Sequence, residues 1–195
     1  MSSKRDLRIE LRSKRRALSP SRQRHSAARL AAHLYQLPAL HRAQHIAIYW
    51  PNDGEIDPRP FITLAMQRDV QIYLPVLAAN GCMKFAAYTH STALKKNTFG
   101  IPEPLWRRGI VKPLWKLDAL LMPLVGFDGS GNRLGMGAGF YDRALASVKG
   151  RFKQPQCWGL AHSCQQIEDL PSDVWDIPME GVITERGVIR FSRRR

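Results

Sequence analysis

A glycine-rich segment lies between an expected strand and an expected helix, and its residue types suit phosphate binding. Six of the 14 glycines fall in this segment: Gly126, Gly129, Gly131, Gly135, Gly137 and Gly139. Glycine allows the backbone to approach a ligand and to adopt positive φ, and a helix N-terminus offers unpaired N–H groups to an anion. The segment has neither the Lys-Ser/Thr of a P-loop nor the spacing of a dinucleotide fingerprint. Its alternative interpretation is a flexible connection that binds nothing.

Charged side chains at two other places could complete such a site. Asp142 lies in the first turn of the helix after the glycines, where a carboxylate could hold Mg²⁺ against phosphates or only complement the helix dipole. Lys4 and Arg8 lie one helical turn apart, and Arg12 continues the row. Like charges at this spacing cost about 0.2–0.5 kcal/mol per pair, which a bound anion would relieve. A solvated basic face is the alternative.

An aromatic residue and an acid lie near the end of an expected strand at residues 45–50. Glu55 comes after a turn at residues 52–54, in the kind of loop that often carries functional side chains. Trp50 could stack against a heteroaromatic ring. The alternatives are a surface acid and a core aromatic residue. The closely spaced histidines and cysteines form no familiar metal-binding pattern, so we interpret them as structural; they are His41, His45, Cys157, His162 and Cys164.

The candidate site residues must be positioned by helices and strands, which are expected to alternate along the sequence. Ser3 can cap a first helix, and residues 18–21 end it and cap a second helix from about 22 to 37. Further helices are expected over 57–68 and from Tyr141 onward, and strands at 45–50, 70–77, 83–88, 119–127, 157–161 and 181–184. This order predicts an α/β fold, a three-layer α/β/α sandwich with a mostly parallel, Rossmann-like sheet. We expect a single domain over residues 1–195, with the basic helical segment at about 3–37 packed on it.

The composition limits the class of protein. The chain has 195 residues, a formal net charge of +14 and 44% hydrophobic residues, which allow a buried core and exclude wholesale disorder. Its apolar runs are too short to cross a membrane. Three cysteines without a CxxC pair favour a reducing compartment, with the cytoplasm as the expected location.

The positive charge is concentrated at the N-terminus, where ten basic residues lie in the first 29 positions. Such a segment could be a nucleic-acid arm, a mitochondrial presequence or a helix whose cations hold a phosphorylated ligand. Two acids, Asp6 and Glu10, and leucines that recur close to helical spacing favour a mature, folded helix.

Six segments, in order along the chain, match the pattern of one known family. The longest covers residues 122–143, with the sequence MPLVGFDGSGNRLGMGAGFYDR. The others are KRDLR at 4–8, YWP and GEID within 49–57, FGIPEP at 99–104, CQ and LP within 164–171, and WDIP and VIT within 175–184. On these motifs the sequence resembles the 5-formyltetrahydrofolate cyclo-ligases, also called methenyltetrahydrofolate synthetases, over nearly its whole length.

The resemblance implies an ATP- and Mg²⁺-dependent enzyme that converts 5-formyltetrahydrofolate to 5,10-methenyltetrahydrofolate and releases ADP and phosphate. In that reaction the formyl oxygen attacks the γ-phosphate, and the neighbouring amine nitrogen then closes the ring as phosphate leaves. The expected partners are ATP and a reduced folate, which could carry a polyglutamate tail attracted by the first helices. Neither a nucleic acid nor a membrane is expected as a partner, and we expect a cytoplasmic monomer.

The resemblance also implies roles for individual residues. The residues matching the ATP site are Lys4, Arg5, Asp6, Leu7, Arg8, Arg133, Leu134, Gly135, Met136, Gly137, Ala138, Gly139, Phe140 and Tyr141, with Lys4 and Arg133 as the catalytic cations. Trp50 and Glu55 match the folate side, and positions 136–140 could also touch folate. Asp142 and Asp176 match metal-binding carboxylates. Met136 and Phe140 depart from the residues common at those positions, which could alter substrate affinity.

Two other functions remain open on the sequence. A nucleic-acid-binding protein would explain the net charge of +14 and the tail Arg193-Arg194-Arg195, although the chain carries no recognisable nucleic-acid module. A folate-binding or regulatory relative would keep the fold without the activity.

Overall fold

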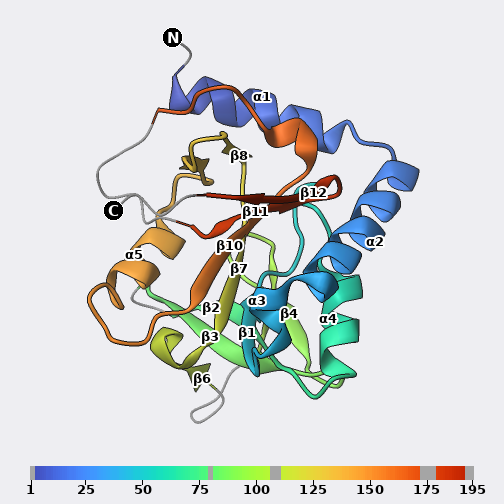
Figure 1. The fold of residues 1–195 in the computed structure, drawn as a ribbon. Helices are drawn as coiled ribbons and strands as arrows, with labels where there is room; N and C mark the ends of the chain where they lie inside the picture. The colour runs from blue at the N-terminus through green and yellow to red at the C-terminus, as the bar shows by residue number, and fades with distance from the viewer. Residues whose placement is uncertain (1–2, 79–80, 106–110, 172–178, 192–195) are drawn as a thin grey trace.

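A central sheet runs through the molecule and carries helices on both faces (Figure 1). The computed structural model describes residues 3–78, 81–105, 111–171 and 179–191. In these ranges eight strands form the central sheet, in the order β12-β11-β10-β7-β1-β2-β3-β6. Their bounds are β1 His45–Ile48, β2 Gln71–Leu77, β3 Met83–Tyr88, β6 Val111–Lys112, β7 Ala119–Pro123, β10 Gln156–Leu160, β11 Gly181–Thr184 and β12 Gly187–Arg190. Neighbours from β11 to β2 pair in parallel, and the outer pairs are antiparallel.

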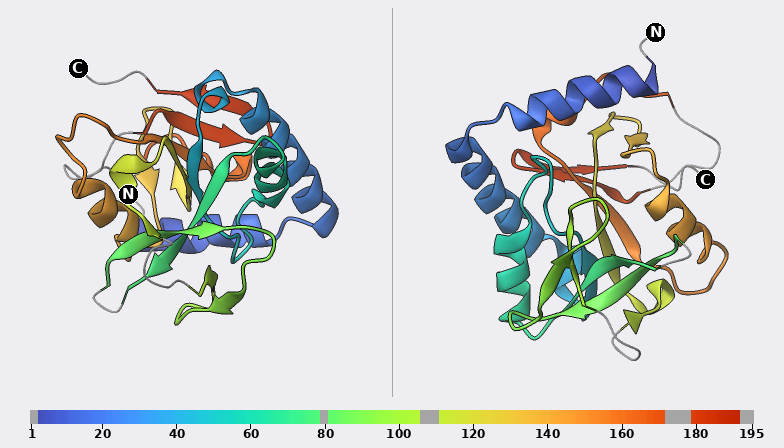
Figure 2. Two further views of the ribbon diagram at one scale, coloured as in Figure 1. Left: turned by 90° about the horizontal axis from the view of Figure 1, so that it is seen from below. Right: turned by 180° about the vertical axis from the view of Figure 1, so that it is seen from behind.

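The two faces of the sheet bury separate apolar clusters. Ile46 and Ile48 of β1 pack in the cluster formed with α2 (Pro20–Gln36), α3 (Pro38–His41) and α4 (Arg59–Met66). Ala47, between them, belongs to the opposite cluster with α5 (Phe140–Ala146) and the short 3₁₀ turn η1 (Leu114–Lys116). Successive residues of a strand point to opposite faces, so a strand buried on both sides is apolar throughout. Figure 2 shows α2 and α4 on one side and α5 on the other, which confirms the expected mostly parallel α/β/α architecture.

Helix α1 (Lys4–Arg16) lies across the end of the sheet where the parallel strands finish (Figure 1). It begins at Ser3 with a capping box, in which Ser3 Oγ accepts from the Asp6 N–H and the Asp6 carboxylate accepts from Ser3. It contacts the segments that follow β7 and β10. Leu11 packs there, and a Cβ at Gly126 would lie 2.5 Å from its side chain, so this close approach requires glycine.

The predicted strand over 119–127 is wrong in its length. β7 ends at Pro123, and the chain then leaves the sheet to form β8 (Gly126–Phe127), which pairs with β9 (Arg133–Leu134) in a small separate hairpin. The change of partner is visible in the backbone, since the Leu124 N–H still bonds to Leu160 in the main sheet whereas the Val125 N–H bonds to Leu134. An apolar run alone cannot show such a change because both parts are buried.

Short elements were missed, and some predicted bounds are shifted. The missed strands are β6, β9, β12 and the hairpin of β4 (Leu94–Lys96) with β5 (Pro102–Pro104); strands of two to four residues show little periodicity, and proline argues against a strand. The helix predicted over 57–68 is shorter and begins at Arg59. The second helix begins at Pro20 rather than 22, because Ser19 caps it and proline suits the first turn. The other predicted strands and the first helix are confirmed to within about two residues.

Among the described residues, we found no helix with the length and apolar character needed to span a membrane.

Candidate active site

The glycine-rich segment lies at the carboxyl edge of the parallel strands and leads into α5, as the sequence predicted, but the β8–β9 hairpin within it was not predicted. The glycine loop at residues 135–139 follows β9. Gly137 and Gly139 have φ angles of +98° and +66°. These values lie in the left-handed region that residues with a Cβ rarely adopt, so the loop shape depends on glycine at both positions. Gly135 to Ala138 are exposed. The loop therefore presents its backbone to solvent at the edge where open α/β sheets bind ligands.

The N-terminal half of α1 meets this loop. Arg8 Nε donates a hydrogen bond of 2.8 Å to the carbonyl of Gly135, 127 residues away in sequence. The Arg8 guanidinium carbon also lies 3.4 Å from the position that a Cβ would take at Gly137. Asp6 and Leu7 serve the helix itself, since Asp6 completes the cap and Leu7 packs beside the Leu11 cluster. The structure thus brings the basic helix and the glycine loop together.

Arg133 and Asp142 form an ion pair, Arg133 Nη2 to Asp142 Oδ1, across the base of the loop. The Arg133 side chain is 8% exposed and the Asp142 side chain 38% exposed. Asp142 is therefore more than a complement to the helix dipole, because its carboxylate orients a buried guanidinium. The sequence offered no sign of this pairing. On the outer side of the loop, Arg143 donates to the Ala138 carbonyl at 2.8 Å.

The fit to Mg²⁺ rests on Asp142. No group of three or more histidine, cysteine or acidic side chains that could cage a metal occurs in the described part of the chain. Mg²⁺ is usually held by one or two carboxylates together with substrate phosphates and water. A partly exposed carboxylate beside a glycine loop with exposed backbone fits that mode. Asp176, the second predicted ligand, lies outside the described residues.

Glu55 lies in the loop after β1 and is largely buried, so its interpretation as a surface acid is wrong. Its side chain is 12% exposed. One carboxylate oxygen accepts a 3.0 Å hydrogen bond from the Asn52 N–H, and the other lies 3.7 Å from Arg15 Nη2. Burial raises the pKa of Glu55 to about 7, although Arg15 opposes the shift. Burial, with the Glu55 charge nearby, also raises the pKa of Tyr141, which places the start of α5 beside the Glu55 loop.

Trp50 lies partly in the core and partly exposed. Its ring meets the edge of Tyr88 with a centroid distance of 5.5 Å, and the Arg59 guanidinium lies 5.6 Å from its centroid. It packs against the cluster beneath α2 and α4. The core interpretation of Trp50 is therefore supported in part, and its stacking on a ligand ring stays a prediction.

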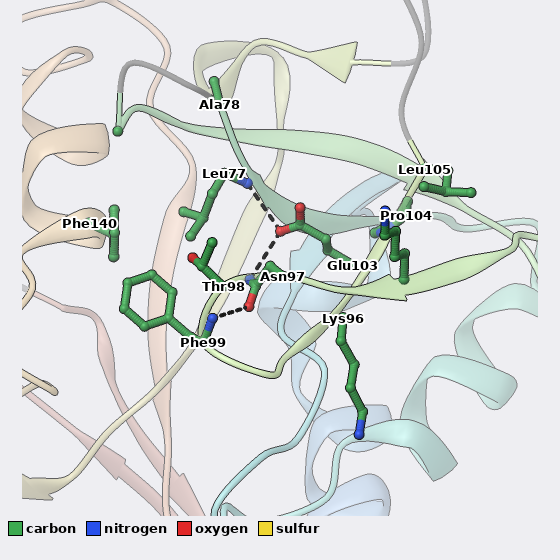
Figure 3. Close-up of a pocket in the computed structure, with 12 residues that line it drawn as sticks. Leu77, Ala78, Lys96, Asn97, Thr98, Phe99, Glu103, Pro104, Leu105 and Phe140 are labelled. Carbon is green, nitrogen blue, oxygen red and sulfur yellow. Dashed lines mark hydrogen bonds between the residues drawn. The ribbon is translucent and has the colours of Figure 1, made fainter.

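A pocket of about 760 Å³ lies beside the glycine loop, between the turn after β2, the β4–β5 hairpin and the start of α5 (Figure 3). Phe99 and Phe140 both line it and contact each other edge to face, with ring centroids 5.8 Å apart. The Glu103 carboxylate accepts from the Leu77 N–H at 3.2 Å and from Asn97 at 3.1 Å, and so joins the hairpin to β2. Of the predicted site residues, Phe140 lines this pocket, whereas Trp50 and Glu55 are absent from its lining. The motif at 99–104 was the only sequence signal for it.

His162 is a second buried titratable group at this edge, where β10 ends. Its side chain is 1% exposed. Burial lowers the pKa of His162 to about 4, and the nearby Arg15 charge acts in the same direction. The ring is therefore neutral near pH 7, which agrees with its structural interpretation from the sequence.

Glu55 and His162 make opposite contributions to stability as the pH changes. The pKa of Glu55 is raised on folding, so its contribution is present below about pH 4.5 and is lost as the pH rises through about 7. The pKa of His162 is lowered on folding, so its contribution is present above about pH 6.5 and is lost as the pH falls through about 4. Each shift corresponds to about 3 kcal/mol. In the parent protein the two effects oppose each other.

Removing the Glu55 carboxylate should reveal the contribution of His162 to the pH dependence of stability. We expect the free energy of unfolding of the Glu55→Gln variant to rise by about 3 kcal/mol more than that of the parent between about pH 4 and 7.5, because the variant lacks the Glu55 contribution that opposes the rise. Urea denaturation at a series of pH values measures this difference. Parallel pH profiles for the variant and the parent would contradict it.

Comparisons with known proteins agree with the geometry. The model described as the 5-formyltetrahydrofolate cyclo-ligase family matches residues 1–185. The chain is 38% identical over 179 residues to a protein of Haemophilus influenzae named 5-formyltetrahydrofolate cyclo-ligase, covering 91% of this chain and 95% of that protein. It is 39% identical over 176 residues to the protein of that name from Escherichia coli K12, covering 89% and 96%. The solved structure of the Aquifex aeolicus 5,10-methenyltetrahydrofolate synthetase superposes with a TM-score of 0.84 at 32% identity, covering 98% of this chain and 94% of that one.

Proposed function

Because the chain belongs to the 5-formyltetrahydrofolate cyclo-ligase family, we propose that it converts 5-formyltetrahydrofolate to 5,10-methenyltetrahydrofolate at the expense of ATP, with release of ADP and phosphate. The observation that carries this proposal is the contact of Arg8 with the glycine loop. It joins a cation of α1 to the exposed backbone of the glycine loop at one edge of the sheet, where an aromatic pocket and the buried Glu55 also lie.

The nucleotide side is formed by the loop at residues 135–139 and the cations around it. Backbone N–H groups and the guanidinium of Arg8 would bind the triphosphate, with Lys4 and Arg133 neutralising charge on the transferred phosphoryl group. Asp142 would hold Mg²⁺, which supplies further charge neutralisation on the phosphates when bound. Phosphoryl transfer depends mainly on positioning and electrostatics, so no protein nucleophile is required.

The folate side is formed by Glu55, Trp50 and the pocket. An ionised Glu55 can accept hydrogen bonds from the amino and ring N–H groups of a pterin. The pocket, which Phe99 and Phe140 line together, offers an apolar wall to the aromatic part of the substrate. Held in this way, the formyl oxygen attacks the γ-phosphorus as the bond to ADP breaks. The neighbouring nitrogen then bonds to the formyl carbon, loses its proton and expels phosphate.

A spectrophotometric assay tests the proposal. Purified protein with ATP, Mg²⁺ and 5-formyltetrahydrofolate should form the absorbing methenyl product, and omission of ATP should abolish the signal. Folate binding without product would favour a binding relative. The nucleic-acid alternative predicts instead a binding constant that falls steeply with salt.

Gly137 provides a separate test of the nucleotide site. The Gly137→Ala variant should bind Mg-ATP about 10-fold more weakly, because a Cβ at a φ of +98° costs about 1–2 kcal/mol and would point at the Arg8 guanidinium. Calorimetric titration with Mg-ATP measures the change. Gly150→Ala is the matched control, since Gly150 also has positive φ, +79°, but no atom lies within 4 Å of its added Cβ. Equal affinity in the two variants would contradict phosphate binding by this loop.

The cysteines and the basic surface bear on the location of the protein and on its further partners. We propose a cytoplasmic location, which the three free cysteines support. Exposed arginines on α1 and α2 suit a polyglutamate tail, and the monomeric state stays a prediction. Arg193 to Arg195, which suggested a nucleic-acid partner, lie outside the described residues.

A further inference from the structure

Arg15 is a fully buried cation at the last turn of α1. Its side chain has 0% exposure. A buried guanidinium is tolerated only where charged and hydrogen-bonding partners surround it. Arg15 Nε donates to the Asp53 carbonyl at 2.8 Å, and Nη2 donates to the Asp53 carboxylate at 3.0 Å. The same Nη2 lies 3.7 Å from Glu55 Oε1.

The opposite side of the guanidinium contacts the segment that leads to the glycine loop. Arg15 Nη1 donates to the Leu124 carbonyl at 3.2 Å. Leu124 immediately follows β7, and Gln165 Nε2 also donates to its carbonyl, at 2.7 Å. One planar group thus joins α1, the loop after β1 and the chain leaving β7. A guanidinium suits this task because its donors are fixed in a plane.

The Glu55 loop is shaped to fit against Arg15. Asp53 and Gly54 have φ angles of +52° and +72°, so the turn is left-handed at two successive residues. A Cβ at Gly54 would lie 3.3 Å from the Arg15 carbonyl oxygen, which shows how closely the turn packs on the end of α1. The Asp53 carboxylate also binds Arg12 and Arg16. Positive φ at Asp53 is unfavourable by itself, so these contacts are needed to hold it.

We propose that Arg15 is a positioning residue for folate binding, which holds the Glu55 carboxylate in place through the Asp53 turn; this inference rests on the proposed function, in which Glu55 receives the pterin. Glu55 faces Arg15 and Arg12 of α1, Asp53 of its own loop, Tyr49 at the end of β1 and Tyr141 of α5. Arg15 is the cation nearest to its carboxylate in the described contacts. Loss of the guanidinium would leave Glu55 buried and easier to protonate, and so a poorer acceptor.

The Arg15→Lys variant tests the role because it keeps the charge and loses the planar donor set. We expect the KM for 5-formyltetrahydrofolate to rise about 10-fold and the KM for ATP to stay within about twofold. In the pH profile of folate affinity, the acid limb, where Glu55 takes up its proton, should move to higher pH by about one unit. In a Glu55→Gln background the same substitution should change the folate KM by less than about twofold, because its effect passes through Glu55. Lys14→Gln is the control, since Lys14 is a cation on the same turn of α1 but pairs with the exposed Glu10 and not with Asp53. Equal losses for folate and ATP, or additive effects in the double variant, would overturn the proposal.

The Asp53→Asn variant should shift the acid limb for folate in the opposite direction. This variant tests the proposal if Arg15→Lys does not fold. Asp53 competes with Glu55 for Arg15, and its charge raises the pKa of Glu55. The acid limb for folate should therefore move to lower pH in Asp53→Asn; an unchanged or higher limb would overturn the proposal. Calorimetry with 5-formyltetrahydrofolate gives the same comparisons as dissociation constants. A parent protein that binds folate without forming product would refute the proposed reaction and leave this inference testable.

Discussion

Replacing Asp142 with asparagine is expected to lower kcat by about 100-fold while changing the KM for folate by less than about threefold. The carboxylate binds the buried Arg133 and lies beside the glycine loop, where Mg²⁺ would accompany the triphosphate. Asparagine keeps the size of the side chain but loses the charge that both partners need. Steady-state kinetics with each substrate varied in turn measures the effect, which should fall on phosphoryl transfer and not on the folate side.

The dependence on Mg²⁺ separates the two roles of Asp142. If the carboxylate binds the metal, higher Mg²⁺ should restore part of the lost rate; if it only orients Arg133, added Mg²⁺ should have no effect. Asp118→Asn is a suitable control, because Asp118 also pairs with a cation, Lys153, but lies at the amino-terminal edge of the sheet, where it accepts from the Gln44 and His45 N–H groups. Parental turnover in Asp142→Asn would mean that the reaction needs neither a metal at Asp142 nor the Asp142–Arg133 pair.

The sequence predicted the parts of this site that are local. The order of strand, glycine loop and helix follows from neighbouring residues, and so does the capped basic helix at the N-terminus. The contact of Arg8 with Gly135 could not be predicted in the same way, because it joins residues 127 positions apart and depends on how α1 crosses the sheet. The β4–β5 hairpin that lines the pocket was also missed, since its prolines and its short strands show no periodic pattern.

The spacing of residues along α1 contains a sign of the burial of Arg15. Leu7 and Leu11 lie on the buried face of α1, and Arg15 follows Leu11 by one helical turn on the same face. A cation within an apolar stripe predicts burial with a partner. The partner itself, the turn at Asp53, could not be found from sequence because its positive φ at a non-glycine residue depends on tertiary contacts.

The Glu55→Gln variant should raise the KM for 5-formyltetrahydrofolate by about 10- to 100-fold and leave the KM for ATP within about twofold. Hydrogen bonds to a charged acceptor contribute about 1.5–3 kcal/mol, and 1.4 kcal/mol corresponds to a factor of ten. Glutamine fills the same space and can still accept from the Asn52 N–H, so the loop after β1 should keep its shape. Steady-state kinetics at about pH 8, where Glu55 is ionised in the parent, gives the largest difference.

The pH dependence of folate affinity should also change in the Glu55→Gln variant. Because the pKa of Glu55 in the free protein is about 7, folate affinity in the parent should rise as the pH passes through neutrality and the carboxylate loses its proton. The glutamine variant has no such group, so that rise should disappear. Glu10→Gln, which removes an exposed acid paired with Lys14, should retain the parental profile. A glutamine variant that lost nucleotide and folate affinity equally would instead mean that Glu55 supports the fold at this edge and does not receive the pterin.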